Sequence, residues 1–105
     1  MKPQNRREIN LYLTEQQHTQ IASMRDAGFT MSAIARLAIR KFADTIIPHD
    51  DANPKAKRVI LYLDPNDYSI LELFASKHDV SLATALRCLI SQYLSVKSEA
   101  IASLF

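Results

Sequence analysis

Residues 8–14, EINLYLT, and residues 58–64, RVILYLD, are two versions of one short segment, 50 positions apart. Each places apolar side chains at alternate positions, the pattern of a strand with one buried face. The residues predicted to face inward are Ile9, Leu11, Leu13, Val59, Leu61 and Leu63. Recurrence at a fixed offset indicates an internal repeat.

A helix-start signal follows each strand. Thr14 has Gln17 three residues later, which is a capping-box arrangement. Asp64 is followed directly by Pro65, so an N-cap carboxylate precedes a proline at the first helical position. Each strand is therefore predicted to lead into a helix.

A second pair of similar segments lies further along the chain. TMSAIARLAIRKFA (30–43) aligns with SLATALRCLISQYL (81–94), at an offset that has grown to 51. Thr30 and Ser81 are plausible N-caps. The apolar residues form a broad stripe at helical spacing, which is typical of a helix buried on more than one side.

The predicted fold class is α+β and mostly α, with two β-α-α repeats that form a pseudo-two-fold unit. Repeat 1 spans residues 1–43 with a basic N-terminal arm, a linker spans 44–57, and repeat 2 spans 58–105 with a C-terminal helical extension. A unit of about 50 residues buries too little surface alone, so we expect one shared core. A lone strand needs a partner, and the linker is long enough for the two strands to pair as an antiparallel ribbon.

The composition excludes several classes of protein. No apolar run approaches the roughly 20 residues of a membrane span, so we expect no membrane partner. The single Cys88 forms no intrachain disulfide and suits a reducing cytoplasm. His49 and His78 have no partners at metal-ligand spacing, and no nucleophile–base pair or Gly-rich phosphate loop is present. We therefore expect no enzyme, no cofactor and no metal.

Positive charge is concentrated in the first half of the chain. Residues 1–43 hold seven Lys/Arg and three Asp/Glu, a balance of +4, whereas residues 57–105 hold five of each, a balance of zero. A basic arm ahead of a strand is compatible with a polyanionic partner.

The order strand, capped helix, turn, second helix resembles the ribbon-helix-helix (Arc/MetJ-like) DNA-binding family. The segments that carry the resemblance are TMSAIARLAI and, with Leu in place of Ala, SLATALRCLI. The presence of two such motifs in one chain is similar to the tandem form of the family, in which a protein of bacterial conjugation carries two motifs per chain. The resemblance covers both repeats and implies a bacterial or mobile-element protein that acts in the cytoplasm.

The resemblance also implies roles for individual residues. Outward residues of the strands would contact base edges in the major groove: Glu8, Asn10, Tyr12, Arg58, Ile60 and Tyr62. The N-termini of the second helices and the basic segments would contact phosphates: Lys2, Arg6, Arg7, Thr30, Met31, Ser32, Lys55, Lys57, Ser81 and Leu82. Arg36 and Arg87 are the helix arginines of the family, for which we favour structural pairing over DNA contact.

The resemblance therefore implies sequence-specific binding of double-stranded DNA. The two strands differ in their outward residues, so the site need not be a palindrome. We expect a transcriptional regulator, a repressor; the alternative is a relaxosome accessory protein that binds a plasmid transfer origin and contacts a relaxase. An antitoxin or a protein-interaction module is the alternative of another class. Contact between further copies on adjacent sites is a second interpretation of the C-terminal extension, beside a simple cap on the core.

Overall fold

The protein is α+β and mostly helical, with a single two-stranded sheet in the part of the chain described. The structure, a computed structural model, describes residues 6–26, 28, 30–48 and 55–102. The elements are, in order, β1 (Arg7–Thr14), α1 (Glu15–Asp26), α2 (Met31–Phe42), β2 (Lys55–Leu63), α3 (Pro65–His78) and α4 (Leu82–Ala102).

The two strands pair with each other within one chain, as an antiparallel ribbon. Asn10 lies opposite Ile60 in the register, and Tyr12 lies opposite Arg58. The register is regular from Arg7 to Leu13 and shifts after Leu13. The pairing confirms the predicted two-stranded antiparallel ribbon.

The helices begin where their capping residues predict. The Gln17 backbone N–H donates to Thr14 Oγ1 at 3.1 Å, and the Thr14 N–H donates to Gln17 Oε1 at 3.0 Å, which completes a capping box. Asp64, Thr30 and Ser81 each accept a backbone N–H from the first turn of the following helix. All four caps are therefore formed by the residues predicted for them.

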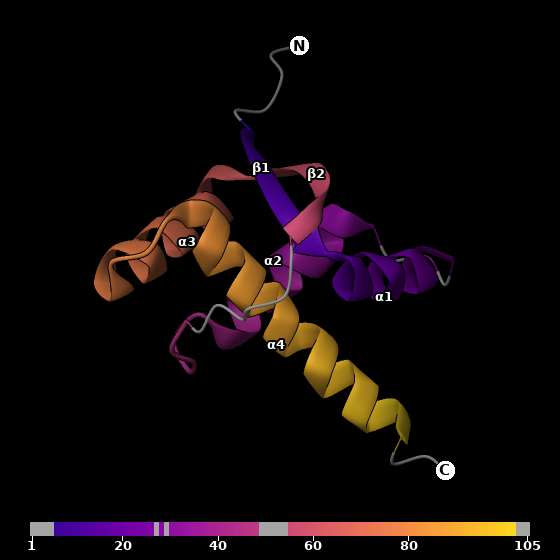
Figure 1. Ribbon diagram of the computed structural model, residues 1–105. Helices are drawn as coiled ribbons and strands as arrows, with labels where there is room; N and C mark the ends of the chain where they lie inside the picture. The colour runs from indigo at the N-terminus through magenta and orange to yellow at the C-terminus, as the bar shows by residue number, and fades with distance from the viewer. Residues whose placement is uncertain (1–5, 27, 29, 49–54, 103–105) are drawn as a thin grey trace.

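All four helices lie on one side of the ribbon, as Figure 1 shows. Helices α2 and α4 pack against each other, and both also contact the sheet. The inner residues of the ribbon are buried in the core formed with them, apart from Val59, which is half-buried. The largest fully buried side chains include Leu11, Leu13, Leu61, Leu63, Ile34, Ile39, Leu86, Leu89 and Ile90.

The structure differs from the prediction in its boundaries. The described residues form one ribbon and four helices around one core, and the expectation of a shared core did not extend to where each element begins. Strand β2 begins at Lys55, inside the segment predicted as a linker, because Thr14 pairs with Lys55 beyond the register shift. Helix α4 continues to Ala102 and runs away from the ribbon (Figure 1), so the described part of the C-terminal extension is helical, and residues 103–105 lie outside the described residues.

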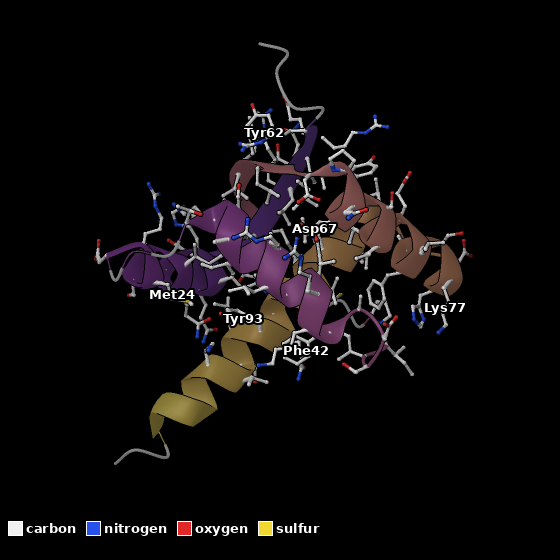
Figure 2. All side chains as sticks on the ribbon, turned by 180° about the vertical axis from the view of Figure 1, so that it is seen from behind. Met24, Phe42, Tyr62, Asp67, Lys77 and Tyr93 are labelled. Carbon is white, nitrogen blue, oxygen red and sulfur yellow. The ribbon has the colours of Figure 1, made fainter. Side chains whose placement is uncertain are left out.

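Arg40 joins helix α2 to the start of α3 through ion pairs with Asp67 and Asp64. The Arg40 Nε atom donates to Asp67 Oδ1 at 2.8 Å, and a second guanidinium nitrogen donates to Asp67 Oδ2 at 3.2 Å. Asp67 is 1% exposed, and Figure 2 shows it beside α2. A buried carboxylate requires such a partner, so the pair specifies how α2 sits against α3.

Candidate nucleic-acid interface

The ribbon exposes one face to solvent, and all six residues predicted to contact bases lie on it. We call this set the outer face: Glu8, Asn10, Tyr12, Arg58, Ile60 and Tyr62. Its large side chains are about half exposed, with Tyr12 at 49%, Ile60 at 46% and Tyr62 at 48%. In Figure 2 Tyr62 stands on the side of the ribbon away from the helices. The alternation predicted from the sequence thus separates a buried face from an exposed one.

Polar groups on the outer face are connected by hydrogen bonds. An Arg58 guanidinium nitrogen donates to Asn10 Oδ1 at 2.8 Å, and Asn10 Nδ2 donates to Glu8 Oε2 at 3.3 Å. Arg58 reaches Asn10 diagonally across the ribbon, since its direct partner in the register is Tyr12. The side chains of one strand therefore orient those of the other.

The N-terminus of α2 opens onto a polar pocket beside the ribbon. The pocket has a volume of about 330 Å³, and its lining includes Arg6, Thr30, Ser32, Arg36 and Tyr62. The first backbone N–H groups of a helix have no intrahelical acceptor, and the helix dipole favours an anion there. Two arginines and a serine hydroxyl lie close to this end, so the pocket combines several groups that can bind a phosphate.

Carboxylates limit the positive potential of the same pocket. Asp64 and Asp67 also line it, but Asp67 is bonded to Arg40. The pKa of Asp64 lies below its ordinary value, chiefly because its carboxylate accepts the Asp67 backbone N–H and also because Arg40 is near. The ion pair with Arg40 therefore offsets part of the negative charge next to the arginines.

The N-terminus of α4 is built differently. Ser81 caps it and is exposed, whereas Leu82 is half-buried and packs on the core. Arg87 donates to the Tyr12 backbone carbonyl at 3.2 Å, so it ties α4 to β1. This contact agrees with the structural pairing favoured for Arg87, whereas its counterpart Arg36 is exposed and lines the α2 pocket.

The remaining predicted phosphate contacts have varied surroundings. The Arg7 guanidinium lies over the Tyr68 ring, 5.1 Å from its centroid, and so packs on α3. Lys57 is exposed, but alternation places it on the same side of β2 as Val59 and Leu61.

The last three predicted phosphate contacts are Met31, Lys55 and Lys2. Met31 is half-buried against the core, so its backbone N–H is the group that can face a phosphate. Lys55 is half-buried at the start of β2, and Lys2 lies outside the described residues.

Two features of the interface were missed from the sequence. The proximity of Arg36 to the α2 N-terminus was recoverable, since it follows Ser32 by one helical turn. The contact between Asn10 and Arg58 joins residues 48 positions apart and depends on the ribbon register, so no local signal could reveal it.

The comparisons with known proteins add no family assignment. No family model matches the chain, and neither a curated protein nor a solved structure does. Within the described residues, no helix is long and apolar enough to span a bilayer. The same residues contain no group of three or more metal-ligating side chains.

Proposed function

We propose that the protein binds double-stranded DNA by inserting the outer face of its ribbon into the major groove. The observation that carries the proposal is the two-sided ribbon: Leu11 and Leu61 are buried beneath it, while Tyr12, Arg58 and Tyr62 are exposed above it. A major groove about 12 Å wide admits a two-stranded ribbon, whose strands are about 4.8 Å apart. Hydrogen-bonding and apolar side chains on such a face can distinguish base edges.

The proposal includes the finer fold assignment, in which the chain contains two ribbon-helix-helix repeats related by a pseudo-two-fold axis. It is supported by the order of the elements and by caps at equivalent places, such as Thr30 and Ser81. The register gives further support, because Asn10 lies opposite Ile60, its own counterpart at the offset of 50. An axis through this pair would exchange the two strands.

Phosphate binding at the helix N-termini would fix the ribbon in the groove. The α2 pocket places Arg6 and Arg36 beside the backbone N–H groups of the first helical turn. At the N-terminus of α4, by contrast, Arg87 donates to the Tyr12 backbone carbonyl. We therefore expect tighter phosphate binding at α2 than at α4. The slope of log affinity against log salt is negative, and a substitution that removes one protein–phosphate interaction should reduce its magnitude by about 0.9.

The experiment is selection of ligands from a random duplex library, followed by affinity measurements between about 50 and 200 mM salt. Enrichment of one sequence, with affinity that falls as salt rises, supports the proposal. Replacing Arg36 with Ala should reduce the magnitude of the salt slope by about one and leave the enriched sequence unchanged. Failure to enrich any duplex would overturn the proposal.

The role we propose for the protein is that of a transcriptional regulator, a repressor that binds a non-palindromic site. The alternative is a relaxosome accessory protein that binds a plasmid transfer origin. The outer face supports an asymmetric site, because Glu8 and Arg58 are counterparts of opposite charge. Binding to DNA upstream of its own gene would favour regulation. Binding to a neighbouring transfer origin, together with a relaxase, would favour the relaxosome.

Protein contact is a second candidate, favoured by an apolar groove away from the ribbon. The groove lies between α2 and α3, has a volume of about 320 Å³ and includes Ile70, Phe74 and Leu73, the last of which is 72% exposed. The groove could bind a second copy of this protein on an adjacent DNA site. If the protein is an antitoxin or an interaction module, the groove could instead bind its protein partner. Leu73→Ser should then abolish cooperative binding to two adjacent sites while leaving affinity for one site unchanged.

A further inference from the structure

The outer face carries opposite charges at equivalent positions of its two strands. Glu8 and Arg58 correspond at the offset of 50, and they lie at opposite ends of the three residue pairs that span the face. Between them Asn10 lies opposite Ile60. A symmetric dimer would present the same side chain from both strands at each of these places. This chain presents the Glu8 carboxylate, an acceptor, at one end of the outer face, the Arg58 guanidinium, a donor, at the other end, and the Asn10 amide in the middle.

The chemistry of the neighbours determines the orientation of the Asn10 amide. Arg58 can only donate, so the atom that faces it at 2.8 Å is the carbonyl oxygen. An ionised Glu8 can only accept, so the atom that faces it at 3.3 Å is the amide nitrogen. Glu8 and Arg58 thus specify the same orientation of the amide.

This orientation limits what Asn10 can do in a groove. An asparagine that pairs bidentately with adenine uses both its carbonyl oxygen and its amide nitrogen. Here the Asn10 carbonyl oxygen already accepts a hydrogen bond from Arg58, and one N–H of the Asn10 amide already donates to Glu8. Arg58 keeps most of its five N–H donors after the bond to Asn10, which is enough for the O6 and N7 acceptors of guanine.

We propose that Asn10 is a positioning residue: it holds the Arg58 guanidinium toward the middle of the ribbon, Glu8 orients Asn10, and Arg58 selects a guanine there. The inference rests on the proposed function and refines it. Asn10 does not contact adenine independently; instead Glu8, Asn10 and Arg58 act together to make one guanine contact. Asn10 then contributes to specificity through the direction in which Arg58 points.

The test uses a variant that keeps the hydrogen-bonded bridge but removes the Asn10 amide. In the double variant Glu8→Gln with Asn10→Asp, the new glutamine amide can donate to the new carboxylate, which still accepts from Arg58. A carboxylate cannot donate to adenine N7, so a bidentate adenine contact would be abolished. Asn10→Ala, which removes the bridge, and Arg58→Ala, which removes the guanidinium, are the matched controls. Thermal melts verify that each variant folds.

Each protein is put through selection from a random duplex library, and its preference at every position of the enriched site is measured. The wild type should prefer one guanine by roughly five- to 150-fold. The double variant should keep that preference, whereas Asn10→Ala and Arg58→Ala should lower it by at least about fivefold. Replacing this guanine with 7-deazaguanine, which lacks the N7 acceptor, should weaken wild-type binding and leave the affinity of Arg58→Ala unchanged.

Three outcomes would overturn the inference while leaving DNA binding intact. The enriched site contains no guanine whose preference depends on Arg58; or the guanine preference persists in Asn10→Ala; or the double variant loses a preference for adenine. Absence of binding to any duplex would instead overturn the proposed function, and the inference with it.

Discussion

Leu11 and Tyr12 are neighbours on β1 that point to opposite faces of the ribbon, so their substitution by alanine separates folding from binding. Leu11 is 0% exposed, whereas Tyr12 is 49% exposed. Truncating a fully buried leucine costs about 2–5 kcal/mol, because transfer free energy is lost and a cavity remains. Truncating an exposed residue of a cross-strand pair costs about 1 kcal/mol or less.

These costs are large relative to the stability of a small domain. A chain of 105 residues is expected to unfold with a free energy of about 5–16 kcal/mol. Leu11→Ala should therefore lower the melting temperature by roughly 8–40 °C, at about 4–8 °C for each kcal/mol. Tyr12→Ala should lower it by less than about 8 °C.

The assay combines urea unfolding, followed by circular dichroism, with binding to the selected duplex at a temperature where both variants are folded. Folded Leu11→Ala should bind with wild-type affinity, whereas Tyr12→Ala should bind more weakly. Equal losses of stability in the two variants would refute the two-sided ribbon. Weakened binding by Leu11→Ala, with Tyr12→Ala unaffected, would refute the assignment of the outer face to DNA.

Further predictions concern the helix ends and acid stability. The pKa of Asp64 is lowered on folding, so the carboxylate stabilises the fold above its ordinary pKa of 3.8, and this contribution is lost as the pH falls through 3.8 and below. Asp64→Asn keeps the cap but should make unfolding less dependent on pH in that range, as acid titrations would show. Gly28 has φ +99°, so Gly28→Ala should destabilise the fold by about 1 kcal/mol or more in urea titrations. Asp79 caps α3 with φ 55°, so Asp79→Gly should raise stability by about 0.5–1 kcal/mol; a loss would contradict the strain assigned to it.

Local chemistry explains why so much of the fold could be predicted. Alternation defined both faces of the ribbon, and the capping residues Thr14, Thr30, Asp64 and Ser81 all begin helices where predicted. These signals involve residues within a few positions of each other, so a single sequence contains them.

The missed features depend on tertiary contacts. Lys55 belongs to β2 because it pairs with Thr14, although lysine is unfavourable in strands and the surrounding composition is typical of a linker. The bond between Arg40 and Asp67 joins residues 27 positions apart and depends on how α2 packs against α3. Aligned positions also diverge: Arg87 bonds to the Tyr12 carbonyl, whereas Arg36 lines a pocket.

Dimethyl sulfate protection of the selected duplex tests the central claim most directly, because this reagent methylates guanine N7 in the major groove. The account predicts that the protein protects guanine N7 within one stretch of major groove, and that Arg58→Ala exposes one of those guanines again while the others stay protected. A stable complex in which no guanine N7 is protected would contradict the placement of the ribbon in the major groove.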